Sequence, residues 1–465
     1  MGAGPNGLAA AITLQRAGLS VLLLESKSTV GGGLRSGALT LPGFIHDYCA
    51  AIHPLAAASP FFQSLPLEEF GLKFLYPEIA LAHPFDDGSD IPLLQDLSAM
   101  ASGMAEDADA YMRLMQPLLE SWPGIEEDML GPLHFPRHPL DMAGFGWKAL
   151  SSANRLSKRF HTEKARGFWA GLAAHSQLPF NRLASSGIGL VLLTAGHKRG
   201  WPVVQGGSQS LADALAAYFT SLGGKIELNQ QIKSLDQLPA THAVLLDVGP
   251  VQLLSIAGRR LSPFYRWQLG RYRYGMGVFK IDWALSERIP FKSASVQKAG
   301  TVHLGGTYSE IAAGESAAWS GKYTDRPAVL LAQQSIVDPL RAPLGKHTGW
   351  AYCHVPAGST LDMTNVVEKQ VERFAPGFRD IILARHTMNT EELETHNANY
   401  IRGDIGGGAN NLSQLFTRPA LRAAPYRSSV QGIYLCSAST PPGGGVHGMC
   451  GYQAANRALR DLFSR

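Results

Sequence analysis

The chain has 465 residues, of which 45% are hydrophobic and 17% are charged, and its formal net charge at pH 7 is +4. This length can bury a large core and suggests about two or three domains. A nearly neutral chain without a dense run of lysine and arginine excludes a nucleic-acid-binding protein. The four cysteines (Cys49, Cys353, Cys436 and Cys450) form no CxxC pair, so neither dithiol redox chemistry nor a thiolate zinc cluster is expected.

The chain offers no segment that could span a bilayer. Its longest apolar stretch, Ile188–Ala195, is far shorter than the ~20 residues that a spanning helix needs. No secretory signal leads the chain, and scattered cysteines fit a reducing compartment. We therefore expect a soluble, cytoplasmic protein. Peripheral contact with a membrane stays open, because an apolar access patch with slight positive charge would suit one.

The first 25 residues predict a turn, a helix and a strand in that order. GAGPNG at residues 2–7 is a glycine turn, and Leu8–Arg16 is an alanine-rich helix that stops at Gly18. Leu19–Leu24 is a wholly apolar strand closed by Glu25. A strand of this kind beside a helix is typical of a parallel sheet covered on both faces.

The predicted secondary structure changes twice in the middle of the chain. Residues 60–200 predict helices broken by prolines and aromatic residues, most clearly at Met100–Trp122, Leu140–Phe160 and Thr162–His175. The α/β pattern returns near residue 205, and residues 260–425 are strand-rich with one helix at Asn365–Phe374. The other elements that we expect are a helix around 211–219, the strands Lys225–Leu228, Ile232–Leu235, Ala243–Asp247 and Gly432–Cys436, and a closing helix through Leu462.

The glycine turn fits GxGxxG at Gly2, Gly4 and Gly7. The first glycine allows the tight turn, the second lets a pyrophosphate approach the backbone, and the third lets helix and strand pack closely. Glu25 ends the next strand about 20 residues later, where a carboxylate can accept hydrogen bonds from ribose hydroxyls. Together these features predict a dinucleotide site.

One part of that unit is missing. The motif normally follows a buried first strand, whereas only Met1 precedes it here. We expect the native product to start upstream of Met1, and a chain without that strand to retain its cofactor weakly.

Two further glycine clusters fit the same site. Gly31-Gly32-Gly33-Leu34-Arg35 follows the nucleotide unit and can continue along a diphosphate. GGGVHG at residues 443–448 also spells GxGxxG, but no strand and acid follow it before Arg465, so a separate NAD(P) domain is not expected.

The motifs GAGPNGLAAAITLQRAG, Glu25, GGGLRS and GIYLCSASTPPGGGVHGMCGYQAANRAL resemble the phytoene dehydrogenase-like oxidoreductases of the phytoene desaturase and amine oxidase superfamily. The nearest branch contains pyridine nucleotide-disulphide oxidoreductase domain-containing protein 2. The resemblance implies an α/β (α+β overall) fold with FAD as the cofactor. It implies a discontinuous Rossmann-type FAD-binding domain of the glutathione-reductase and amine-oxidase kind, formed by residues 1–60, 203–260 and 425–465. Residues 61–202 and 261–424 would form a mixed substrate domain with a helical insertion.

The resemblance also implies the residues that hold FAD. The tail loop opens a helix whose positive end would face the flavin pyrimidine ring. The expected contacts are Gly2, Gly4, Pro5, Asn6, Gly7, Glu25, Ser26, Gly32, Gly33, Leu34, Arg35, Ile232, Ser437, Gly444, Gly445, Val446 and His447.

Catalytic groups are less well marked. The resemblance places His46, Asp47, Cys49 and His53 beside the isoalloxazine, and His53 and His447 are the two candidates for a catalytic role. A structural role is the commoner one for such a histidine, and Cys450 is expected to be a small buried hydrophobe. His134 and His138 flank Pro136 and do not make a metal site, so no metal is expected.

The sequence thus predicts an FAD-dependent oxidoreductase that moves a hydride from a small, hydrophobic substrate to flavin N5. Oxygen, a quinone or another acceptor would reoxidise the flavin. Two alternatives stay open: a carotenoid or isoprenoid desaturase proper, and a non-catalytic regulatory flavoprotein on the same fold. The sequence leaves the substrate, the electron acceptor and the oligomeric state undetermined.

Overall fold

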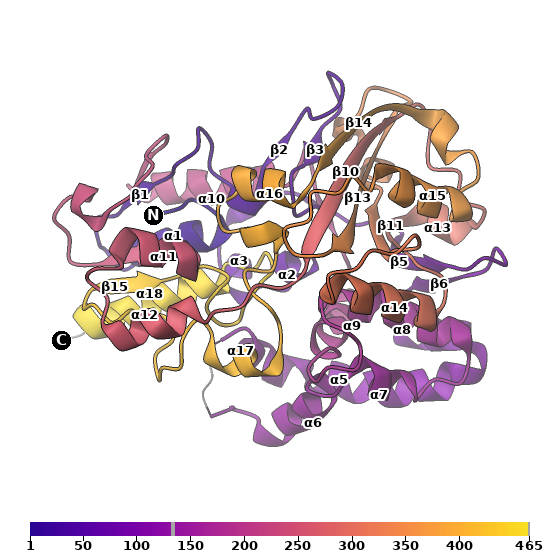
Figure 1. Cartoon of the computed structure of the whole chain (residues 1–465), viewed down its shortest axis with the longest axis horizontal. Helices are drawn as coiled ribbons and strands as arrows, with labels where there is room; N and C mark the ends of the chain where they lie inside the picture. The colour runs from indigo at the N-terminus through magenta and orange to yellow at the C-terminus, as the bar shows by residue number, and fades with distance from the viewer. Residues whose placement is uncertain (132–134, 464–465) are drawn as a thin grey trace.

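The computed structural model describes residues 1–131 and 135–463, and Figure 1 shows them as two halves side by side. One half contains both chain ends and the short parallel strands. The other contains a seven-stranded sheet and a group of helices below it.

The first half is built around the helix α1 (Pro5–Arg16). Proline at its first position costs no hydrogen bond, and every residue from Asn6 to Leu14 is buried. The helix is therefore enclosed by its neighbours on nearly all sides. The elements in contact with α1 include β1 (Leu22–Leu24), α10 (Gln209–Ser221), β9 (Val244–Leu246) and α18 (Met449–Leu462). The same half also contains β8 (Lys225–Glu227), α11 (Pro250–Ala257), α12 (Pro263–Gly270) and β15 (Ile433–Leu435).

The first residues of the chain join two strand pairs, in each of which the strands are parallel. Strand β1 pairs with β8, and β15 pairs with β9. Met1 lies between the pairs: its N-terminus donates to Leu245 O at 2.8 Å, and its carbonyl accepts from Asp247 N at 2.8 Å. Gly2 N donates to Leu24 O at 2.7 Å on the other side. Met1 and Gly2 thus occupy the position between β1 and β9 where the sequence motif calls for a strand.

Glycines let α1 approach its neighbours backbone to backbone. A Cβ on Gly7 would overlap the carbonyl oxygen of Gly2, and a Cβ on Gly451 would overlap the carbonyl oxygen of Asn6. Glycine is therefore required at position 451 for α18 to pack this closely on α1, and at position 7 for α1 to pack against the turn that precedes it.

The second half is organised by the seven-stranded sheet. One face carries the apolar side chains of Phe279, Ile281, Trp283, Leu331 and Cys353, which pack on α15 (Thr364–Phe374). The opposite face of the sheet points toward the interior of the molecule. The strand order is β14 (Ile382–Met388), β10 (Gly277–Leu285), β13 (His347–Val355), β12 (Val329–Ala332), β11 (Ala299–Leu304), β5 (Ile79–Pro84) and β6 (Asp90–Leu93).

Helices below the sheet form a core of their own, in which Tyr111, Leu114, Phe168 and Trp169 are fully buried. These helices are α4 (Leu97–Gly103), α5 (Ala108–Met129), α6 (Pro139–Ala149), α7 (Ala153–Ser157), α8 (Glu163–Ala174), α9 (Gly187–Arg199) and α14 (Tyr308–Trp319). The shorter elements are β2 (Ser36–Gly37), β3 (His46–Asp47), α2 (Pro54–Ala57), α3 (Pro60–Gln63), β4 (Phe74–Leu75), β7 (Val203–Val204), α13 (Ala294–Lys298), α16 (Thr390–His396) and α17 (Leu412–Thr417).

Several expected elements differ from those observed. The predicted helix 100–122 is two helices, because the chain turns at Ala105 with a φ of 49°. The predicted helix 140–160 breaks before α7, where the Ser152 side chain accepts a hydrogen bond from Arg155 N. The predicted strand Ile232–Leu235 is wrong, since Ser234 instead caps a short 3-10 turn. Helix α14 lies in the region expected to be strand-rich; Thr307 caps it.

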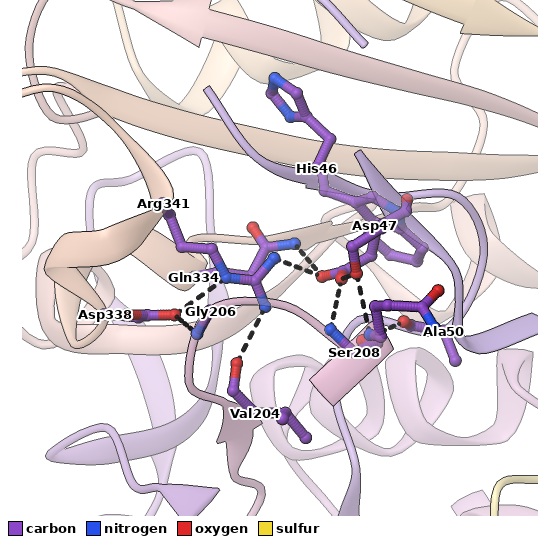
Figure 2. A network of polar contacts seen from close by, with 12 residues as sticks. His46, Asp47, Ala50, Val204, Gly206, Ser208, Gln334, Asp338 and Arg341 are labelled. Carbon is purple, nitrogen blue, oxygen red and sulfur yellow. Dashed lines mark hydrogen bonds and ion pairs between the residues drawn. The ribbon is translucent and has the colours of Figure 1, made fainter. Parts of the chain in front are cut away.

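A buried charge network links the two halves (Figure 2). Arg341 is fully buried and lies 2.9 Å from the carboxylate of Asp47 and 3.0 Å from that of Asp338. Asp47 also accepts from Ser208 N at 2.8 Å, which ties β3 to the start of α10. Burial alone would raise the pKa of Asp47, but Arg341 and the hydrogen bonds from Ser36 and Ser208 outweigh it and lower that pKa.

The close contact at Gly7 yields a stability prediction. Gly7→Ala should lower the free energy of unfolding by about 3 kcal/mol or more, because the new methyl group meets a backbone atom that cannot rotate away. Thermal or urea unfolding measures the change.

Gly144→Ala in α6 is the matched control, because open space surrounds that position. It should stabilise the protein by roughly 0.5–1 kcal/mol, the usual gain for alanine inside a helix. Equal effects of the two substitutions would contradict the proposed packing.

Candidate functional site

A cavity of about 630 Å³ lies where the two halves meet. Its wall includes the glycine turn at residues 2–6, the segment Cys49–Leu55, the sheet strands β11 to β13 and the tail loop at 444–446. This volume lies within the usual range of ligand sites, about 300–1,000 Å³.

At one end, the glycine turn leaves bare backbone facing the cavity. Gly2 has a φ of 87°, and Gly4 precedes the first turn of α1. A Cβ on Gly32 would come within 3.0 Å of the Gly4 Cα, so the second glycine cluster lies directly against the first. Asn6 lines the cavity at the N-terminus of α1, and its buried Oδ1 atom has no partner among the described residues. This end of a helix favours negative charge.

Glu25 is held rigidly at the same end. Its carboxylate accepts hydrogen bonds from Ala3 N at 2.7 Å and Lys27 N at 2.9 Å, and it forms an ion pair with Arg35 at 3.2 Å. Arg35 in turn donates to the carbonyls of Thr29 and Gly32. Both charged groups line the cavity and are fixed by the backbone around them.

Asp247 is a member of the site that sequence reasoning missed. It follows β9, lines the cavity, and accepts a hydrogen bond from Gly7 N at 3.0 Å. Burial raises the pKa of Asp247 to about 7, although the Gly7 hydrogen bond opposes this shift. The sequence signal that could have identified Asp247 is an apolar strand that ends in an acidic residue, as at Glu25.

The tail loop supplies the other wall. Gly444, Gly445 and Val446 line the cavity, and Gly448 precedes α18 with a φ of 67°. Cys450 is buried behind the loop, where its thiol contacts the carbonyl oxygens of Thr440 and Gly443.

The two catalytic candidates differ in position. His53 lines the cavity, and its Nε2 lies 2.8 Å from the Ser208 hydroxyl, which itself donates to Ala50 O. His53 Nε2 must therefore donate, leaving Nδ1 as a bare acceptor. His447 does not line the cavity: its Nδ1 accepts from Met449 N at 3.0 Å. Burial lowers the pKa of each histidine to about 4, so both are neutral at pH 7.

The cavity brings together most of the residues expected to hold a cofactor. Gly7, Leu34 and His447 lie behind its wall. Asp47 lies outside it in the buried network, and His46 lies outside it with its ring between Thr40 and Asp282, whereas Cys49 lines it. The expected residues on the wall are Gly2, Gly4, Pro5, Asn6, Glu25, Ser26, Gly32, Gly33, Arg35, Ile232, Ser437, Gly444, Gly445 and Val446.

The far end of the cavity contains residues that no motif marked. His175 follows α8, Thr301 lies on β11, and Trp201, Trp350 and Tyr352 add aromatic surface. In the described part of the chain, no group of three or more His, Cys, Asp or Glu could hold a metal ion. His134 of the rejected histidine pair lies outside the described residues.

The raised pKa of Asp247 predicts a pH-dependent stability. Between pH 4 and 7 the folded protein keeps a proton on Asp247 that an unfolded aspartate, with a pKa of 3.8, releases. The stability of the native chain relative to Asp247→Asn should therefore fall as the pH rises through this window. At pH 8 the variant should be more stable by about 2–4 kcal/mol, and at pH 4 the two should be nearly equal.

Unfolding of both proteins at a series of pH values measures this difference, in which the titration of other groups cancels. Asp325→Asn, at an exposed position, is the control and should follow the native curve. Parallel curves for Asp247→Asn and the native chain would show that Asp247 is not protonated in the fold.

Comparison with known proteins supports the expected relationship. Residues 1–65 match the family model of an NAD(P)-binding Rossmann-like domain. Pyridine nucleotide-disulfide oxidoreductase domain-containing protein 2 of Rattus norvegicus is 27% identical over 99% of this chain and 93% of its own length. The lycopene-forming phytoene desaturase of Pseudescherichia vulneris is 23% identical over 99% of this chain and 98% of its own.

Solved structures share the fold along the whole chain. An oxidoreductase from Methanosarcina mazei superposes with a TM-score of 0.66 at 17% identity, covering 99% of this chain and 98% of its own. Putrescine oxidase bound to putrescine superposes with a TM-score of 0.62 at 17% identity, covering 100% of this chain and 98% of its own. The predicted α/β fold and the predicted resemblance are thus confirmed: the chain is similar along its whole length to a phytoene desaturase and to pyridine nucleotide-disulfide oxidoreductase domain-containing protein 2, and it shares its fold with putrescine oxidase.

Proposed function

We propose that the chain binds FAD in this cavity and oxidises a small, largely apolar substrate. The observation that carries the proposal is a single cavity that touches the glycine turn, Glu25 and the tail loop at one end and apolar side chains at the other. The division into a nucleotide domain (1–60, 203–260 and 425–465) and a substrate domain (61–202 and 261–424) is part of the proposal.

The residues present fit such a cofactor. Gly2, Gly4 and Gly32 line the cavity at the N-terminus of α1, where backbone N–H groups can approach a diphosphate. A Cβ on Gly2 would meet Asp247 and one on Gly32 would meet Gly4, so this close arrangement needs glycine. Glu25 is placed to accept from ribose hydroxyls, while Gly444 and Gly445 admit a flat ring beside the tail loop. Near neutral pH, the raised pKa of Asp247 lets it carry a proton beside an anion.

The protein's own part is binding, positioning and exclusion of water. The chemistry that FAD supplies when bound is acceptance of a hydride from a substrate carbon, with electrons then passing to oxygen, a quinone or another acceptor. Arg35 fixes Glu25, and the His53–Ser208 hydrogen bond fixes the segment that carries Cys49 and His53 against the cavity. His53 is neutral and buried, which favours a positioning role over proton transfer.

Absorbance of the purified full chain tests the proposal. A yellow preparation with a flavin spectrum and free FAD after denaturation is expected, and anaerobic substrate addition should bleach it. A colourless preparation that takes up no added FAD would contradict the proposal. Bound flavin that no substrate panel bleaches would favour the regulatory alternative.

Glu25→Ala should weaken FAD binding by ~1–3 kcal/mol, because hydrogen bonds from ribose to a charged acceptor are lost. Glu25→Gln keeps an oxygen acceptor, and its affinity for FAD should lie between those of the native chain and Glu25→Ala. Fluorescence titration of the apoprotein with FAD measures the dissociation constants.

Glu227→Ala is the matched control. This glutamate lies on β8, beside the end of β1 that leads into Glu25, but its side chain is exposed. It should bind FAD as the native chain does. An unchanged dissociation constant for Glu25→Ala would refute the role of Glu25.

We further propose peripheral contact with an anionic membrane surface through α6. Leu140 and Trp147 of this helix are 87% and 69% exposed. Residues 135–160 carry one acidic residue, Asp141, and five basic ones: Arg137, Lys148, Arg155, Lys158 and Arg159. Apolar side chains beside basic ones suit an interfacial helix. Among the described helices, none is long and apolar enough to cross a membrane.

Flotation with vesicles tests this contact. The native chain should float with vesicles that contain phosphatidylserine, and Trp147→Ala should float less. Trp267→Ala is the matched control, because Trp267 is also exposed and also stacks with an arginine. Native protein that stays at the bottom with and without anionic lipid would contradict the proposal.

A further inference from the structure

Two histidines touch at the far end of the cavity. His175, directly after α8, lies on the cavity wall, and its Nε2 is 2.9 Å from the Nε2 of His303 on β11. One of these nitrogens must donate and the other accept, so the two rings cannot both be charged. Burial lowers the pKa of His175 to about 3 and holds that of His303 well below its ordinary value. The pair is therefore neutral.

The surroundings decide which nitrogen carries the proton. His303 Nδ1 is buried with no partner in the described structure. A bare lone pair is less costly there than an unpaired N–H group, so His303 carries its proton on Nε2 and donates to His175. His175 then carries its own proton on Nδ1. Within the described residues His175 makes its hydrogen bond through Nε2 only, so this N–H remains available to a ligand.

A second polar group lies nearby. Thr301 shares a face of β11 with His303, because residues two apart point to the same side of a strand. Thr301 lines the cavity. Its hydroxyl oxygen is buried and has no hydrogen-bond partner among the residues described. Two hydrogen-bonding groups without partners at one wall of a cavity indicate a ligand with a polar atom there.

Among the described residues, no charged side chain lines the rest of this end. Trp201 packs against His175, and Ile188, Leu192 and Leu330 add apolar surface. The other polar side chains on the wall here are uncharged: Gln177, Tyr352 and Asn410. The charged side chains of the described cavity wall are Glu25, Lys27, Arg35 and Asp247, all at the glycine-turn end. His354 Nδ1 lies 2.8 Å from the Glu315 carboxylate nearby, and neither residue lines the wall.

We infer that the substrate is an uncharged molecule with an apolar body and one oxygen, a hydroxyl or a carbonyl, that accepts a hydrogen bond from His175 with Thr301 as the second partner. An ammonium group at this end would be desolvated beside a neutral imidazole without a carboxylate. A pure hydrocarbon would leave His175 and Thr301 unpaired. This inference rests on the proposed function for the site and specifies its substrate class.

Binding of matched eight-carbon probes tests the inference. Quenching of tryptophan fluorescence reports occupancy, because Trp201 and Trp350 lie on the wall. We compare 1-octanol, octylamine at pH 7 and octane. The native chain should bind 1-octanol at least tenfold more tightly than octylammonium.

His175→Phe should weaken 1-octanol about tenfold and leave octane unchanged. Thr301→Val, which is nearly isosteric, should weaken 1-octanol about threefold and keeps the test available if the first variant does not fold. His161→Phe, at an exposed position, is the control and should bind all probes as the native chain does. Octylammonium that binds as tightly as 1-octanol, or an alcohol preference that survives both substitutions, would overturn the inference.

The flavin spectrum separates the two proposals. A yellow protein without alcohol preference overturns only the substrate class. A colourless protein that takes up no added FAD but keeps the preference overturns the flavin proposal and supports the role of His175.

Discussion

The structure depends on the close approach of backbones around the first turn of α1. Gly7 lies against the carbonyl of Gly2, Gly451 of α18 lies against the carbonyl of Asn6, and Gly7 N donates to the carboxylate that follows β9. Three distant segments meet at this point because their contacts involve backbone atoms and one short side chain. The same approach leaves bare backbone at Gly2 and Gly4 on the cavity wall, so the packing of α1 and the shape of this wall follow from one constraint.

The cavity separates charge from apolar surface. Its glycine-turn end carries a helix N-terminus, an ion pair and an acid with a raised pKa, while its far end presents a neutral histidine pair among apolar side chains. The buried Arg341 network connects the two halves along one side. Buried ion pairs contribute little net stability, since desolvation offsets their attraction, but they strongly disfavour arrangements in which one partner is left alone. This network therefore restricts how the halves can be arranged around the cavity.

Local patterns in the sequence predicted the structure of the first 25 residues well. A glycine turn, an apolar strand and an acid are determined by neighbours in the chain, so α1, β1 and the place of Glu25 followed directly. The position of Asp247 was missed because its role comes from a contact with Gly7, 240 residues away. His175 and Thr301 were missed for the same reason: each looks like a core residue until strands and helices are assembled. The prediction of helix ends was wrong where a single residue determines the break, as at Ala105 and Ser152.

The contact between α1 and α18 joins the two ends of the described chain. During synthesis on the ribosome, the first helix emerges long before the last one, and its alanine-rich surface stays uncovered until that last helix arrives. Loop closure over such a distance is slow, and exposed apolar surface promotes aggregation. The half that contains α1 consequently cannot be completed before its last helix has been made.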